Sequence, residues 1–237
     1  MIDDLASVTK CGLDTVKANS VINSFIESKR LELGNKKSNR LHIGKKSNNH
    51  KCYKLNVHGI EMNDSNIEKY IGDLISDDGK HSANIASRKS KGFGIAGDVL
   101  AILNEIPFGR HRIEAGIYMR NGMLINGMLT NSETWYGIDE ECIEELEKLQ
   151  NLFLRVILQT PKGTPRTALK WETGTWPMEN RIFYRKLTFA NAIKHSKQES
   201  LAKQIWEEQR KNKWPGLSEE SAEICTELGL PKMKNEK

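Results

Sequence analysis

Two adjacent carboxylates near the N-terminus, Asp3 and Asp4, are the residues of this sequence best suited to phosphoryl-transfer chemistry. They follow the apolar pair Met1-Ile2 and precede Leu5-Ala6. Two carboxylates on a tight hairpin can hold Mg²⁺, because this ion prefers a few carboxylate oxygens together with phosphate and water. Two-metal phosphoryl transfer needs such a clamp on the attacking and leaving oxygens. The same pair is also typical of a helix cap or an exposed turn.

Lysine and arginine gather in separate stretches of a chain whose formal net charge is +5. The first stretch contains Lys29, Arg30, Lys36, Lys37, Arg40, Lys45, Lys46, Lys51 and Lys54, and the second contains Lys80, Arg88, Lys89 and Lys91. Such blocks suit a phosphate backbone, because each neutralised phosphate releases condensed counterions. A solvated, lysine-rich surface is the alternative interpretation.

The elements that must position these side chains change in type near residue 80. Before it, apolar spacing predicts a helix over 13–30, and alternation predicts short strands over 5–9, 31–33, 41–43, 53–57 and 70–75. After it, the pattern predicts helices over 85–106, 113–130, 138–158, 167–172, 178–193, 201–211 and 218–228, separated by proline and glycine. We therefore expect an α+β protein, with a small N-terminal antiparallel β/α piece followed by a mostly helical bundle.

Several protein classes are disfavoured by composition and pattern. No apolar run is long enough to span a bilayer, and the N-terminus lacks the pattern of a secretory signal, so we expect an intracellular protein without membrane partners. Nucleus and cytoplasm stay equally open. The four cysteines contain no CxxC pair, which favours free thiols over disulfides or structural zinc.

Three short motifs follow one another in an order that resembles a known enzyme family. Residues 1–6, Met-Ile-Asp-Asp-Leu-Ala, resemble the aromatic-x-Asp-Asp core of reverse transcriptases, with Met1 at the usually aromatic position. Residues 31–38 resemble the next motif of non-LTR retrotransposon enzymes, and residues 68–72, Glu-Lys-Tyr-Ile-Gly, resemble the primer-grip hairpin. Residues 149–177 resemble the helical region that follows the thumb. The chain thus resembles the C-terminal part of a non-LTR retrotransposon reverse transcriptase.

This resemblance implies catalytic roles at three positions. Asp3 would bind Mg²⁺ with Asp4 beside it, and Lys37 would protonate the departing pyrophosphate. Lys36 is an alternative to Lys37, and either lysine could instead be merely solvated. Polymerisation needs a further palm aspartate and the fingers, which the family places before the Asp-Asp turn. We therefore expect Met1 to be an internal methionine of a longer or decayed reading frame, and the isolated chain to be inactive.

The resemblance also implies nucleic-acid contacts and a division into three parts. Residues 1–79 would be a partial palm, 80–135 a helical thumb and 136–237 a post-thumb helical region. Tyr70, Ile71 and Gly72 would form the primer grip, although a plain buried strand fits these residues equally well. The basic side chains Arg88, Lys89, Lys91, Arg110, Arg112 and Arg120 would follow the backbone of an RNA template paired with a DNA primer. A helical interaction protein, or a nucleic-acid-binding protein without catalysis, is the alternative.

Two groups of side chains in the second half have simpler structural interpretations. Core packing is favoured over base stacking for the aromatic residues Trp135, Tyr136, Trp171, Trp176 and Phe183. The acidic residues Asp139, Glu140, Glu141, Glu144, Glu145 and Glu147 crowd the start of an expected helix, where the helix dipole favours negative charge. We therefore expect neither a stacking surface nor a metal site from these residues.

Overall fold

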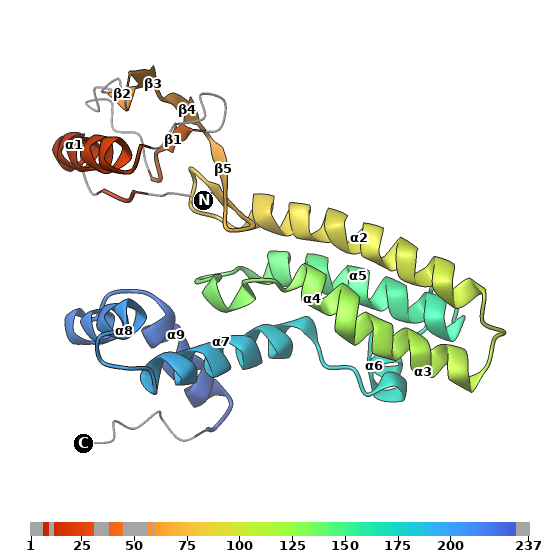
Figure 1. Cartoon of the computed structure of the whole chain (residues 1–237). Coiled ribbons are helices and arrows are strands. Elements are labelled where there is room, and N and C mark those ends of the chain that lie inside the picture. The colour runs from red at the N-terminus through yellow and green to blue at the C-terminus, as the bar shows by residue number, and fades with distance from the viewer. Residues whose placement is uncertain (1–6, 10–11, 31–37, 45–55, 58, 231–237) are drawn as a thin grey trace. The chain divides into compact units, whose positions relative to one another are not determined.

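The computed structural model divides the chain into two compact units, residues 1–84 and 85–237 (Figure 1). The structure describes residues 7–9, 12–30, 38–44, 56–57 and 59–230. Short strands belong to the first unit and a bundle of helices to the second, so the expected α+β class is confirmed. Among the described residues, no helix is both long and apolar enough to cross a membrane.

One helix and six short strands make up the described part of the first unit. Helix α1 spans Gly12–Lys29, which confirms the helix expected over 13–30. The strands are β1 (Asn39–Leu41), β2 (Asn56–Val57), β3 (Ile60–Glu61), β4 (Asn63–Ser65), β5 (Ile67–Tyr70) and β6 (Asp73–Ser76). In α1, Asn19 donates a hydrogen bond from Nδ2 to the carbonyl oxygen of Asn56 at 2.7 Å, which ties the helix to β2.

The strands form three separate pairs instead of one sheet. Strands β2 and β3, and β5 and β6, pair antiparallel, as the sequence predicts, whereas β1 and β4 pair parallel. An ion pair at 2.6 Å between Arg40 and Asp64, which face each other in the register of β1 and β4, reinforces the parallel pair. The single strand expected over 70–75 is wrong, because the backbone reverses at Ile71 and Gly72 and makes a hairpin there.

The second unit is a bundle whose helices follow the expected ranges closely. They are α2 (Ser82–Asn104), which begins in the first unit, α3 (Arg110–Met119), α4 (Ile125–Met128), α5 (Glu140–Leu158), α6 (Arg166–Thr173), α7 (Met178–Lys194), α8 (Leu201–Asn212) and α9 (Leu217–Glu227). The helix expected over 113–130 is interrupted by a π-helical segment, η1 (Arg120–Leu124), and a 3₁₀ turn, η2 (Ser132–Thr134), follows it. Proline precedes α6 and α7, where its missing N–H costs no helical hydrogen bond.

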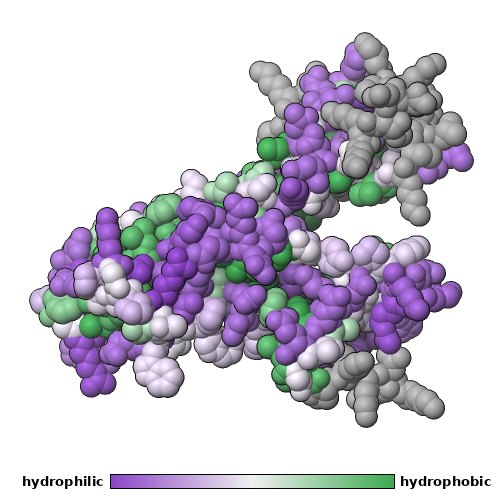
Figure 2. Space-filling model, turned by 180° about the vertical axis from the view of Figure 1, so that it is seen from behind, coloured by the Kyte–Doolittle hydropathy of each residue, from purple (hydrophilic) through white to green (hydrophobic). Residues whose placement is uncertain are grey.

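The bundle has one main hydrophobic core and a smaller one near its C-terminal end. The main core takes buried residues from α2, η1, α4, α5 and α7, and it includes Val99, Leu124, Trp135, Leu146 and Ile182. It therefore extends across residue 135, where the sequence suggests a boundary between thumb and post-thumb regions. The smaller core packs Ala190 and Ile193 of α7 against Trp206 of α8. On the face seen in Figure 2, hydrophobic residues reach the surface between hydrophilic ones.

Candidate nucleic-acid interface

The expected catalytic residues lie outside the part of the chain that the structure describes. Asp3 and Asp4 fall within residues 1–6, and Lys36 and Lys37 fall within residues 31–37. Within the described ranges, no three or more histidine, cysteine, aspartate or glutamate side chains are grouped to hold a metal ion. The Mg²⁺ site at Asp3 and Asp4 stays a prediction.

The expected primer-grip residues form the tip of a two-stranded hairpin. Tyr70 ends β5 and faces Asp73 of β6 in the antiparallel register, so Ile71 and Gly72 are the two residues of the turn. Both have positive φ, 46° for Ile71 and 86° for Gly72, as the right-handed twist of a tight hairpin requires. Glycine adopts this backbone freely, whereas a β-branched isoleucine adopts it only with strain. Tyr70, Ile71 and Gly72 are all exposed at this tip.

Polar contacts form at both ends of β6, and those next to the hairpin turn join it to the first turn of α2. The buried amide of Asn84 accepts a hydrogen bond from the backbone N–H of Leu74 at 3.2 Å and donates one to Asp73 at 3.1 Å. At the other end, Asp78 accepts from the Ser76 hydroxyl and from the backbone N–H of Lys80. These two hydrogen bonds lower the pKa of the Asp78 carboxyl. Asn84 is a positioning residue that the sequence pattern did not indicate.

The three basic residues expected to contact nucleic acid from α2 have different environments. Arg88 is only 4% exposed, so its guanidinium group lies inside the bundle. Lys89 forms an ion pair with Glu145 of α5, and Glu145 also binds Lys148 at 2.5 Å. Lys148 and Lys89 together lower the pKa of Glu145 to about 2. Lys91 is exposed and is the member of this group best placed to meet a phosphate.

The arginines expected further along the thumb also differ in burial. Arg110 is exposed and pairs with Glu114 at 2.7 Å, one helical turn away. Arg112 donates to the Asn104 side chain at 2.9 Å, across the turn between α2 and α3. Arg120 is completely buried, which contradicts the expectation of a surface cation there. Arg120 begins the π-helical segment, and its guanidinium group donates to Asn121 and Gln150 inside the bundle.

A buried polar network surrounds Glu147 of α5. Its carboxylate accepts hydrogen bonds from the backbone N–H of Met178 at 2.8 Å and from Asn151 at 3.1 Å, and it pairs with Lys170 at 2.7 Å. Gln150 donates to the same carboxylate and accepts from Arg120. Burial raises the pKa of Glu147, but Lys170 and the Met178 N–H outweigh this effect, and the net shift is downward.

The sequence analysis grouped Glu147 with the acidic residues at the start of α5, so its buried role was not predicted. The first of these residues, Asp139, caps α5 by accepting a hydrogen bond from the Cys142 N–H at 2.8 Å, which confirms an electrostatic role at the helix start. Glu147 instead lies among buried residues and joins α5 to α6 and α7. The available signal was its spacing to Gln150 and Asn151, which places three polar side chains on the apolar stripe of α5.

The expectation of core packing holds for some aromatic residues and fails for others. Trp135 is buried in the main core. Trp171 is 89% exposed and Trp176 is 53% exposed, so core packing is wrong for both. These two tryptophans lie on either side of Gly174, whose positive φ of 58° ends α6 and turns the chain toward α7. Helix periodicity does not predict the exposure of residues at such a turn.

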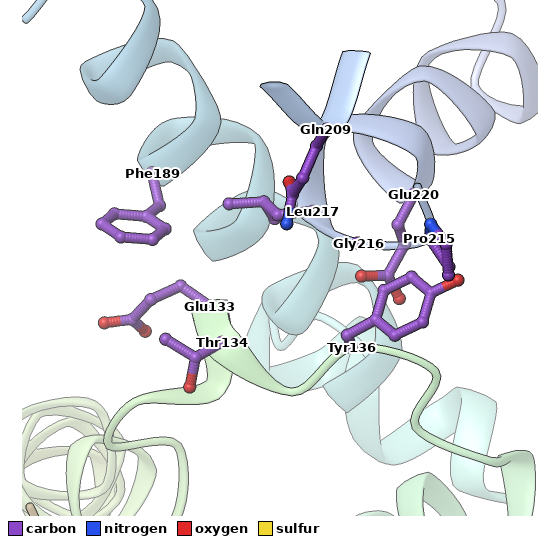
Figure 3. A pocket seen from close by; sticks show the side chains of 9 residues that line it. All are labelled: Glu133, Thr134, Tyr136, Phe189, Gln209, Pro215, Gly216, Leu217 and Glu220. Carbon is purple, nitrogen blue, oxygen red and sulfur yellow. The ribbon is translucent and has the colours of Figure 1, made fainter. Parts of the chain in front are cut away.

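A hollow of about 340 Å³ opens to solvent where α7, α8 and the turn before α9 meet η2. Figure 3 shows Phe189 at one side of the hollow and Tyr136 with Glu220 at the other. Glu133 also lines it. The lining residue Glu220 accepts a hydrogen bond at 2.5 Å from the fully buried Lys186, which also donates to the Trp135 carbonyl at 2.7 Å. The hollow is unsuited to a phosphate group, because Glu133 and Glu220 line it.

No family model, no curated protein and no solved structure matches this chain.

Proposed function

We propose that this chain is a fragment of the RNA-directed DNA polymerase of a non-LTR retrotransposon, and that it binds an RNA–DNA template–primer hybrid. It carries half of the two-metal site for nucleotidyl transfer, at Asp3 and Asp4. One observation carries this proposal: a tight hairpin exposes Tyr70, Ile71 and Gly72 directly before the long helix α2. A hairpin and a following helical bundle are what the family resemblance implies at these positions.

The exposed hairpin tip suits contact with a nucleic-acid backbone. Gly72 has no side chain, so a strand can approach the peptide closely. Tyr70 adds an aromatic ring and a hydroxyl group that is able to donate a hydrogen bond to phosphate. The exposed Lys91 supplies a cation in the helix that follows. Contacts of these kinds hold a backbone without reading its sequence.

The binding of a fluorescent RNA–DNA hybrid to the whole chain tests this proposal. We expect the affinity to fall steeply between about 50 and 200 mM salt, because binding releases counterions. Lys91→Ala should weaken binding and reduce the salt slope by about one. Tyr70→Ser should weaken it as well, whereas Tyr70→Phe, which keeps the ring, should change it less. The control Lys162→Ala removes an exposed lysine from the turn before α6 and should have little effect.

Two results would contradict hybrid binding by these residues. One is a hybrid affinity no greater than that of an acidic control protein. The other is an affinity that neither Lys91→Ala nor Tyr70→Ser changes. Either result would favour a helical interaction protein.

Primer extension on an RNA template tests the catalytic half of the proposal. We expect no incorporation with Mg²⁺ or Mn²⁺, because the family places its further palm aspartate before the Asp-Asp turn, and only Met1 and Ile2 precede Asp3 in these 237 residues. Incorporation that disappears in Asp3→Asn would show that this chain assembles a complete site, and would overturn the expectation of inactivity.

A further inference from the structure

Two exposed aromatic residues and two half-buried arginines lie around the beginning of α7: Trp176, Tyr184, Arg181 and Arg185, which we call the Trp176 face. Trp176 is 53% and Tyr184 60% exposed. Their ring centroids are 6.1 Å apart and their planes are inclined by 78°, an edge-to-face contact. Such a contact covers one face of one ring, and more than half of each residue stays exposed for further stacking.

The two arginines lie on the same side of α7 as Tyr184. Arg181 is three residues before Tyr184 and four before Arg185, and these spacings make neighbours on a helix surface. Arg185 is held in place by Asn126 at 2.7 Å and by the Leu129 carbonyl at 2.9 Å. The only carboxylate of α7, Glu179, lies two residues before Arg181 and therefore on the opposite side of the helix. No acidic residue of α7 neutralises the two arginines.

Positive charge is in excess behind this face. The buried Arg120 and the half-buried Arg181 both donate to the Asn121 side-chain oxygen, at 2.8 and 3.4 Å. In the described part of the chain, the Nε atoms of these two arginines have no hydrogen-bond partner. Burial and the charge of Arg181 lower the pKa of Arg120 to about 9, with Glu147 opposing them. Glu147 already binds Lys170, so an anion arriving at the face would relieve repulsion between arginines.

We propose that the Trp176 face binds a single-stranded segment of RNA, whose bases stack on Trp176 and Tyr184 and whose phosphates contact Arg181 and Arg185. Aromatic rings beside cations form the usual platform for single strands, because every base has a face to stack. A duplex does not offer its base faces in this way. The choice of RNA over DNA rests on the proposed function, in which the template is RNA and is unpaired outside the hybrid.

The test measures the affinity of the whole chain for a fluorescent uridine RNA of about 12 nucleotides, by anisotropy. Trp176→Ala and Tyr184→Ala should each weaken binding about tenfold, because each removes a stacking surface. Trp176→Phe should restore most of the affinity, since it keeps an aromatic ring. The matched control is Trp214→Ala, which removes a comparably exposed tryptophan from the turn between α8 and α9 and should leave the affinity unchanged. Circular dichroism confirms that each variant is folded.

Further arms separate stacking on RNA from other uses of the face. An abasic strand of the same length keeps the phosphates, so its weaker binding should not respond to Trp176→Ala. Two results would overturn the assignment. One is that Trp176→Ala weakens binding of the abasic strand as much as binding of the uridine RNA. The other is that a deoxyuridine DNA of the same length binds as tightly as the RNA or more tightly. A concentration-dependent dimer in sedimentation that Tyr184→Ala abolishes would also overturn it, because the face would then bind a second copy of this chain.

The two nucleic-acid proposals can fail separately. If Lys91→Ala and Tyr70→Ser weaken hybrid binding while uridine RNA is not bound, the Trp176 face has no such role and the proposed function stands. If uridine RNA is bound through Trp176 while the hybrid is not bound at all, the proposed function fails.

Discussion

At the scale of single residues, Glu147 is a buried carboxylate whose removal should destabilise the fold. Glu147 is 7% exposed and joins α5 to Lys170 of α6 and to the first N–H of α7. A buried carboxylate of this kind is tolerated only because its hydrogen bonds and its cation offset the loss of hydration. Removing the charge leaves Lys170 and the buried Arg120 without their counter-charge.

Glu147→Gln should lower the free energy of unfolding by about 3 kcal/mol near neutral pH, because it leaves the buried Arg120 and the partly buried Lys170 without their counter-charge. The folded-state pKa of Glu147 lies below its ordinary 4.5. Its stabilising contribution is therefore complete above pH 4.5 and is lost as the pH falls through the lower folded value. Urea denaturation should show the difference between the native chain and the variant shrinking as the pH falls below 4.5. A difference that does not vary with pH would contradict this assignment.

Glu144→Gln is the matched control for that measurement. Glu144 pairs with Arg166 at 2.6 Å, but both side chains are over 40% exposed, at 41% and 46%. Solvent screens exposed pairs, so its loss should cost no more than about 1 kcal/mol.

At the scale of elements, α2 is long and rich in glycine, and its glycines differ in what surrounds them. A Cβ atom at Gly92 would lie 2.7 Å from Leu149 and 2.9 Å from Met128, whereas a Cβ at Gly94 would meet nothing within 4 Å. Gly92 thus allows α2 to approach α5 and α4 closely, and Gly94 is exposed. The two positions share a residue type and a helix but differ in tertiary environment.

Gly92→Ala and Gly94→Ala should therefore change stability in opposite directions. Alanine at Gly94 should raise the free energy of unfolding by up to about 1 kcal/mol, through helix propensity alone. Alanine at Gly92 should lower it by about 1 kcal/mol or more, because overpacking against the buried Leu149 and Met128 outweighs that gain. Thermal unfolding of the two variants provides the comparison. A melting temperature raised equally by both would show that the contact at Gly92 relaxes freely.

At the scale of the whole molecule, every buried residue of the main core belongs to the second unit, residues 85–237. The buried cluster begins at Ile85 and takes its members mainly from α2, η1, α4, α5 and α7. Its members extend across residue 135, so the thumb and post-thumb regions of the resemblance share one core.

A fragment of residues 82–237 should accordingly fold by itself. It keeps the start of α2 at Ser82 and every buried residue of the main core. We expect strong helical circular dichroism and a single cooperative thermal transition, as buried apolar surface drives cooperative folding. A broad, non-cooperative transition would show that residues before Ser82 complete the core.

The sequence by itself determined the α+β class, the range of α1 and almost all helices of the bundle. These features are local: helical spacing of apolar residues marks each helix, and proline and glycine mark its ends. The family resemblance also indicated the hairpin at Tyr70, whereas strand alternation alone took it for one strand, because the positive φ of Ile71 is not visible in a periodic pattern.

Tertiary structure alone decided which of the chemically similar side chains are buried. Arg88 and Arg120 belong to the same basic series as Lys91, yet both lie inside the bundle. Trp135 is buried in the core while Trp176 lies at the surface beside Tyr184. Burial depends on which helix packs against which stripe, and that contact joins residues far apart in the chain. The acidic pair at Asp3 and Asp4 lies outside the described residues, and its role rests on the sequence alone.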